Sequence, residues 1–161
     1  MQSAAALFAS QGYYKTTTAH VANAVGVTQP YVFHFFKTKE QLYLAVLEKA
    51  FERMMQHFFA VDAPPDQLSK EMGRQFDLLL HSQRNEMLLL MQSFTTPEPA
   101  VRQFAKEKYS LIYDRLLERF MKAGIPNPQW EASSFIATGL TVTLSEVLEL
   151  PKLNPWCETA P

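Results

Sequence analysis

Apolar residues recur along the chain at three- and four-residue intervals, the spacing that brings side chains to one face of an α-helix. The pattern predicts helices at residues 3–11, 29–36, 39–61, 66–82, 98–122 and 129–149, a helix capped by Thr17, and another that contains residues 87–91. Proline or glycine separates most of these segments, and Gly12 is expected to end the first of them. No segment alternates apolar and polar residues as a half-buried strand does. We therefore expect an all-α protein.

Residues 17–42 predict two short helices around a tight turn, followed by the start of a third. Gly26 ends the first helix, because glycine accepts a positive φ. Thr28 is expected to cap the second through its side-chain oxygen, and Pro30 suits a first helical turn. Val32 and Phe36, four residues apart, are the expected anchors. The outward face then carries Thr28, Gln29, Tyr31 and His34, a set suited to base edges in a major groove.

This stretch resembles the DNA-binding domain of the TetR family of bacterial transcriptional regulators. The residues that carry the resemblance are Leu7-Phe8, Gly12-Tyr13, Thr16-Thr17, Val21-Ala22, Gly26-Val27-Thr28, Phe33-His34-Phe35-Phe36 and Lys37-Thr38-Lys39-Glu40-Gln41-Leu42. Phe33 departs from the family's usual tyrosine. The resemblance implies a three-helix helix-turn-helix DNA-binding domain at residues 1–46 and a helical effector-binding and dimerisation domain at residues 47–161.

The resemblance also implies a set of DNA contacts. Base or groove contacts are expected from Gln29, Tyr31 and His34, with support from Thr28 at the helix start. Phosphate contacts are expected from Thr17 and from Lys39, which begins the helix at residue 39. Outside this motif, each of the six would be read as an ordinary surface residue.

The remainder of the chain is rich in methionine and phenylalanine, which form deformable apolar interiors. The resemblance implies a cavity for an effector here, and such an interior suits a small hydrophobic one, although a filled core is the alternative for each residue. The predicted lining residues are Met55, Phe58, Met72, Phe76, Met87, Met91, Phe94, Phe104 and Tyr113. The helix at residues 39–61 would connect this cavity to the DNA-binding head.

The helix at residues 129–149 carries a broad apolar stripe that contains small residues. Its members are Phe135, Ile136, Gly139, Leu140, Thr143 and Val147. The resemblance implies that the last two long helices of the family form a homodimer, so we expect this stripe at a dimer interface. The alternative is that it packs on the core of its own chain.

Charge and composition exclude several other classes. The chain of 161 residues has a net charge of −1, but residues 1–50 hold four lysines against two glutamates and are net +2. Cys157, the single cysteine, has no partner for an internal disulfide, which is typical of a cytoplasmic protein. The four histidines lack metal-ligand spacing, and we expect no metal, cofactor, membrane partner or enzymatic activity.

The sequence thus predicts a cytoplasmic transcriptional regulator. We expect a homodimeric repressor that binds a palindromic double-stranded DNA operator and is released by a small hydrophobic effector. The alternative is a helical ligand-binding or protein-interaction module that has lost DNA binding.

Overall fold

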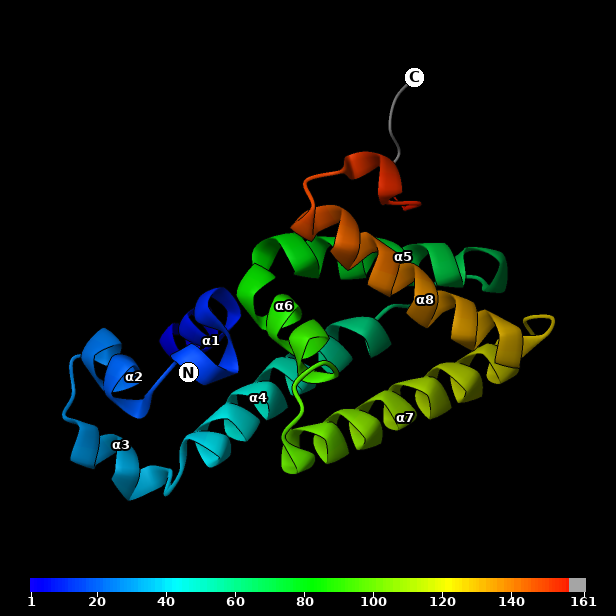
Figure 1. Cartoon of the computed structure of the whole chain (residues 1–161). Helices are drawn as coiled ribbons and strands as arrows, with labels where there is room; N and C mark the ends of the chain where they lie inside the picture. Colours follow the sequence, from blue (N-terminus) through cyan, green and yellow to red (C-terminus); the bar gives the residue numbers. More distant parts are fainter. Residues whose placement is uncertain (157–161) are drawn as a thin grey trace. The chain divides into compact units, whose positions relative to one another are not determined.

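The structure is a computed structural model that describes residues 1–156, so Cys157 lies outside the described residues. It is all-α, as predicted, and these residues contain no strand. The helices are α1 (Gln2–Lys15), α2 (Thr18–Val25), α3 (Gln29–Phe35), α4 (Lys39–Phe59), α5 (Pro65–Ser82), α6 (Arg84–Ser93), α7 (Pro99–Lys122), α8 (Pro128–Val147) and the short 3₁₀ helix η1 (Pro151–Leu153) (Figure 1).

Helix α1 differs from its prediction, because it does not end at Gly12. Gly12 interrupts the helix with φ 77° and ψ 170°, and one further helical segment continues to Lys15. Thr16, which is fully buried, stabilises this kink. Its hydroxyl donates to the carbonyl of Gly12 at 2.9 Å and lies 3.2 Å from that of Leu7. The helix that was expected to end at Gly12 is therefore only bent there, and a second helical segment follows the glycine.

The chain divides into two compact units, and unit 1 contains residues Met1–Arg53 and Gln83–Lys106. Phe8 of α1 is fully buried and meets Tyr43 of α4 edge to face, with ring centroids 4.8 Å apart. Helix α6 packs against α1, where the Gln92 side chain donates to the carbonyl of Ala9 at 3.0 Å. This packing holds α1 in place for the helices that follow it.

Unit 2 contains residues Met54–Ser82 and Glu107–Pro161, as far as they are described. Helices α5 and α8 pack against each other over a core that includes the fully buried Met72, Leu116 and Phe120. The Arg119 guanidinium of α7 donates to the carbonyls of Phe59, the last residue of α4, and of Val61, and so satisfies backbone acceptors at and just beyond the end of that helix.

The predicted boundary after residue 46 remains a prediction about the DNA-binding module. The compact unit that contains this module continues to Arg53 and also takes in residues 83–106. An ion pair contributes to this extension, because Arg53 of α4 lies 2.9 Å from the buried Glu86 of α6. A buried carboxylate needs such a partner.

Candidate functional site

The backbone of the α2-turn-α3 segment follows the prediction. Thr17 precedes α2, and its side-chain oxygen accepts a hydrogen bond from the His20 amide at 3.1 Å. Gly26 has φ 72°, the left-handed conformation that ends α2. Val21 of α2 and Val32 of α3 are buried and anchor the two helices to the rest of unit 1. The turn and the buried positions therefore confirm the predicted helix-turn-helix geometry.

Thr28 differs from its prediction in one respect. It occupies the residue before α3, but its side chain makes no capping hydrogen bond. Only its carbonyl joins the helix, by accepting from the Val32 amide at 3.3 Å. The exposed Thr28 hydroxyl is therefore not used to cap α3, and the proline in the first turn already removes one of the donors that a cap would satisfy.

The outward face of α3 carries the residues that the sequence placed there. Gln29, Tyr31 and His34 are all exposed. Gln29 is also tied to α2, because its side-chain amide donates to the Thr18 hydroxyl at 3.0 Å. The Tyr31 ring packs edge to face on Phe35 at 5.2 Å. The structure thus brings the three predicted groove contacts onto one short helix.

Phe33 and Phe35 lie at the surface of α3, which the sequence analysis did not predict. They are 40% and 59% exposed, whereas Phe36 is half-buried. A signal was present in the sequence, since a helix turns by about 100° per residue and four consecutive ring-bearing residues, from Phe33 to Phe36, cannot all face one core. These two phenylalanines add apolar surface to α3, which can contact thymine methyl groups.

A half-open apolar pocket of about 150 Å³ lies at the surface of this three-helix head. Its walls come from α1 to α4 and include Val25, Tyr31 and Phe35. Tyr31 therefore has two surroundings, because its ring lines the pocket while the residue as a whole is 55% exposed.

Lys39 takes part in the packing of α1. Its ammonium donates to the carbonyl of Tyr13 at 2.9 Å and lies 3.4 Å from that of Tyr14. It also sits 4.2 Å from the centroid of the Tyr13 ring, a cation–π geometry. These carbonyls belong to the last turn of α1, where a cation is favoured by the helix dipole. The phosphate contact predicted for Lys39 remains a prediction.

Tyrosine hydroxyls beside Lys39 gather near Glu98, which precedes α7. A hydrogen bond from Tyr14 to the Glu98 carboxylate raises the pKa of that tyrosine. Burial is the main cause that raises the pKa of Tyr13, with Glu98 as a second cause. Burial likewise raises the pKa of Tyr43, although a hydrogen bond with Thr96 opposes it. The three phenols therefore remain neutral, and we assign them to the packing of unit 1 and not to acid–base chemistry.

The predicted lining residues of the effector cavity are divided between the two units. In unit 2, Phe58, Met72 and Phe76 are buried, and Met55 and Tyr113 are half-buried. In unit 1, Met87 is buried, Met91 and Phe104 are half-buried, and Phe94 is 48% exposed. Phe94 therefore lies at the surface, because it follows the end of α6. The cavity itself stays a prediction.

The buried aromatic residues of unit 2 form one cluster. Phe58 lies 5.5 Å from Phe76 and 5.8 Å from Phe135, measured between ring centroids. Trp156, which the sequence analysis did not select, joins the cluster at 5.9 Å from Phe76 and 5.2 Å from Phe135. The available signal was a large aromatic residue in a proline-rich C-terminal segment.

The stripe predicted on α8 separates into two faces. Phe135 and Thr143 are buried inside unit 2, Ile136 and Gly139 are half-buried, and the Gly139 backbone lies near Phe76. Leu140 and Val147 are 36% and 51% exposed. Phe135 and Thr143 thus pack on their own chain, which is the alternative weighed for this stripe. The opposite face presents Leu140, Leu144, Val147 and Leu148, all exposed.

Two other kinds of site are absent from the described part of the chain. Within residues 1–156, no helix is long and apolar enough to cross a membrane. The same residues hold no group of three histidine, cysteine, aspartate or glutamate side chains placed to bind a metal ion.

Comparison with known proteins identifies the N-terminal segment. Residues 1–46 match the family described as "Bacterial regulatory proteins, tetR family". No match was found among curated protein sequences.

Solved structures share the fold. AibR in complex with isovaleryl coenzyme A and operator DNA superposes with a TM-score of 0.74 at 23% identity, over 89% of this chain and 83% of AibR. The TetR family transcriptional regulator PfmR from Thermus thermophilus gives 0.71 at 16% identity, over 99% and 87% of the two chains. A TetR/AcrR family regulator from Thermobifida fusca gives 0.64 at 16% identity, over 98% and 96%.

Proposed function

We propose that this chain, whose residues 1–46 belong to the tetR family of bacterial regulatory proteins, is a repressor that binds a palindromic operator as a homodimer and leaves it when a small effector binds. The match of residues 1–46 to this family supports the proposal that the chain is a DNA-binding transcriptional regulator. The sign of regulation, the dimer and the effector are further parts of the proposal.

The observation that carries DNA binding is the geometry of α2 and α3. The left-handed Gly26 and the buried Val32 leave Gln29 and His34 exposed on a short helix. An amide and an imidazole can both read base edges in a major groove. The hydrogen bond from Gln29 to Thr18 holds α3 against α2 and so fixes the orientation of the exposed face of α3.

Phosphate contacts are proposed for Thr17, which precedes α2, and for Lys39, the first residue of α4. Lys39 is a weaker candidate, since its ammonium already donates to the carbonyl of Tyr13. Thr28 is proposed to support the groove contacts at the start of α3, because its exposed hydroxyl is not used as a helix cap.

The proposed dimer uses the exposed face of α8, with Leu140, Leu144, Val147 and Leu148 against the same face of a second copy. Residues 140, 144 and 147 follow a four- and three-residue spacing, which forms one apolar seam along a helix. A two-fold dimer would present two α3 helices to a palindrome.

The proposed effector is small and largely apolar, because the interior of unit 2 is lined by aromatic rings and methionine. AibR supports the general scheme, since that structure contains both operator DNA and isovaleryl coenzyme A. Release would follow if the effector prefers the conformation that does not fit DNA.

Selection from a pool of random DNA duplexes tests the proposal. We expect an enriched palindrome with half-sites separated by about one helical turn, and an affinity that falls steeply as salt rises. His34→Ala should relax base preference at one position of each half-site. Lys39→Ala, at a proposed phosphate contact, should weaken all sequences alike. Binding that selects no sequence and ignores salt would instead favour a module that has lost DNA binding.

A further inference from the structure

The backbone of α5 comes unusually close to an indole ring at Gly73. A Cβ atom placed on Gly73 would lie 2.4 Å from Cε2, 2.6 Å from Cδ2 and 2.8 Å from Nε1 of Trp156. Ordinary carbon contacts are about 3.5–4.0 Å. The indole therefore occupies space that exists only because residue 73 has no side chain, and we call this space the Gly73 slot.

Two aromatic rings form the walls of the Gly73 slot. Phe76 meets the indole edge to face, with an interplanar angle of 76° and centroids 5.9 Å apart. Phe135 of α8 lies 5.2 Å away at an angle of 38°. Edge-on and inclined contacts at these distances are favourable for aromatic pairs. The slot is thus shaped for a flat aromatic ring held between α5 and α8.

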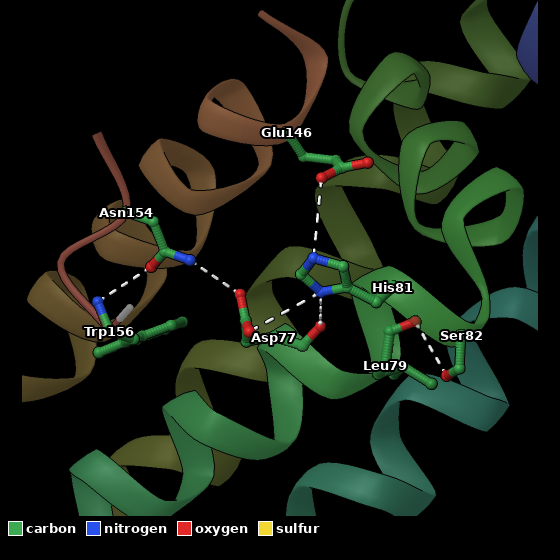
Figure 2. A network of polar contacts seen from close by, with 7 residues as sticks. All are labelled: Asp77, Leu79, His81, Ser82, Glu146, Asn154 and Trp156. Atoms are coloured by element: carbon green, nitrogen blue, oxygen red, sulfur yellow. Dashed lines mark hydrogen bonds and ion pairs between the residues drawn. The ribbon is translucent and has the colours of Figure 1, made fainter. Parts of the chain in front are cut away.

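The rim of the slot is polar and acidic. Asn154 donates to the Asp77 carboxylate at 2.8 Å, and its carbonyl oxygen accepts from the Trp156 amide at 2.9 Å (Figure 2). His81 lies between Asp77 and Glu146, at 3.7 Å and 4.0 Å from their carboxylate oxygens. Two carboxylates therefore face one histidine, and Asp77 receives a donor from the C-terminal segment.

We propose that the Gly73 slot is a binding site for a planar aromatic ligand with a cationic amine arm, and that Trp156 is its internal occupant. The ring of such a ligand would replace the indole, and its ammonium would replace the Asn154 amide at Asp77. A charged donor at a carboxylate makes a stronger hydrogen bond than a neutral amide does. This inference rests on the proposed function and deepens it, because it names a class of effector.

The attachment of Trp156 makes exchange with a ligand feasible. Its segment follows α8 through a short 3₁₀ helix, and the Ser145 hydroxyl donates to the carbonyl of Leu150 at 2.8 Å before that helix begins. Beyond η1, Asn154 and Trp156 provide the side-chain contacts just described. A short segment that is built from turns and a three-residue helix opens at a lower free energy than the long helices on which it packs.

Internal occupancy has a measurable consequence. A ligand that must displace Trp156 binds with a dissociation constant raised by the reciprocal of the fraction of open slots. Replacing Trp156 should therefore tighten binding of a matching ligand. A matching ligand should in turn expose the indole of the unmodified chain.

Tryptamine is a suitable probe, since it carries an indole ring and an ammonium arm. We would record ¹⁵N–¹H spectra of the full ¹⁵N-labelled chain during titration with unlabelled tryptamine. The Trp156 indole signal, assigned by its loss in Trp156→Phe, should move toward the position of an exposed indole. The signal of Trp130, which is 69% exposed, is the internal control and should not move.

Variants give the matched comparison. Trp156→Ala should bind tryptamine at least about tenfold more tightly than the unmodified chain, because the competing ring is gone. Trp156→Phe keeps an aromatic ring of smaller size and should lie between the two. In the Trp156→Ala background, Asp77→Asn should weaken tryptamine by about tenfold and should leave indole itself unaffected.

Two results would overturn the inference. If neither Trp156→Ala nor Trp156→Phe gains affinity, the slot is not a ligand site. If they gain affinity but the Trp156 signal of the unmodified chain stays in place at saturating tryptamine, the indole is a permanent part of the core. These spectra contain no DNA, and the duplex selection contains no tryptamine, so the two proposals fail independently.

Discussion

The substitution Gly73→Ala provides a direct test of the packing in unit 2. Alanine in a helix interior is favoured over glycine by about 1 kcal/mol. At Gly139 of α8 a new methyl group would lie 3.8 Å from Phe76, an ordinary contact, so Gly139→Ala should keep this gain. At Gly73 the methyl group would lie 2.4 Å from Trp156, and the indole must leave its position.

The expected cost can be estimated from the burial of the indole. Removing a large buried aromatic side chain from a core typically costs about 3–5 kcal/mol. Trp156 is only half-buried, so its release should cost roughly 2–3 kcal/mol. After the gain in helix propensity, Gly73→Ala should lower the free energy of unfolding by about 1–2 kcal/mol, whereas Gly139→Ala should raise it by up to about 1 kcal/mol.

Urea unfolding followed by circular dichroism measures both variants, and tryptophan emission reports whether Trp156 becomes exposed. The double variant is more informative, because Gly73→Ala should no longer destabilise the protein when Trp156→Ala is already present. Such non-additivity is the mark of a direct contact. The reasoning is refuted if Gly73→Ala costs the same with and without the indole, since the two residues would then not touch.

Three further predictions concern other parts of the chain. Thr17→Ala should destabilise unit 1 by about 1 kcal/mol through loss of the α2 cap, while Thr28→Ala, which removes no capping bond, should change thermal stability much less. A hydrogen bond with a backbone carbonyl raises the pKa of His81, so its stabilisation is present below pH 6.5 and is lost as pH rises through the raised value; comparison with His81→Gln in pH-dependent unfolding should show an effect of only a few tenths of a kcal/mol. Leu144→Glu should produce monomers in analytical ultracentrifugation, while Leu78→Glu, at an equally exposed leucine of α5, should not; an unchanged dimer in both would contradict the proposed α8 interface.

Local sequence chemistry was sufficient for the helix-turn-helix. Gly26 requires no distant partner to end α2, because its left-handed φ is accessible to glycine wherever it stands. The cap at Thr17 likewise uses an amide only three residues away. These features depend on neighbours in the chain, and so the helix positions could be predicted from it.

Local chemistry was insufficient for Gly12 and Thr28. Gly12 was expected to end a helix, but the buried Thr16 stabilises a kink and the helix resumes. Thr28 has the residue type of a cap, yet its hydroxyl stays outside the helix hydrogen bonds. Each outcome depends on how the surrounding side chains pack. Helix propensity describes single residues and contains no information about that packing.

Helical periodicity shows which residues share a face, but not which of two apolar faces a helix buries. On α8 the burial of Phe135 and the exposure of Leu144 were decided by α5 and by Trp156, which occupy one side of the helix. The Gly73 slot could not be predicted from the sequence. It joins Gly73 to Trp156, which are 83 positions apart, through a contact that is possible only because glycine has no side chain. The sequence by itself determined an all-α chain with a helix-turn-helix near its start. Tertiary packing decided which surfaces remained for partners, since burial depends on neighbours that are distant along the chain.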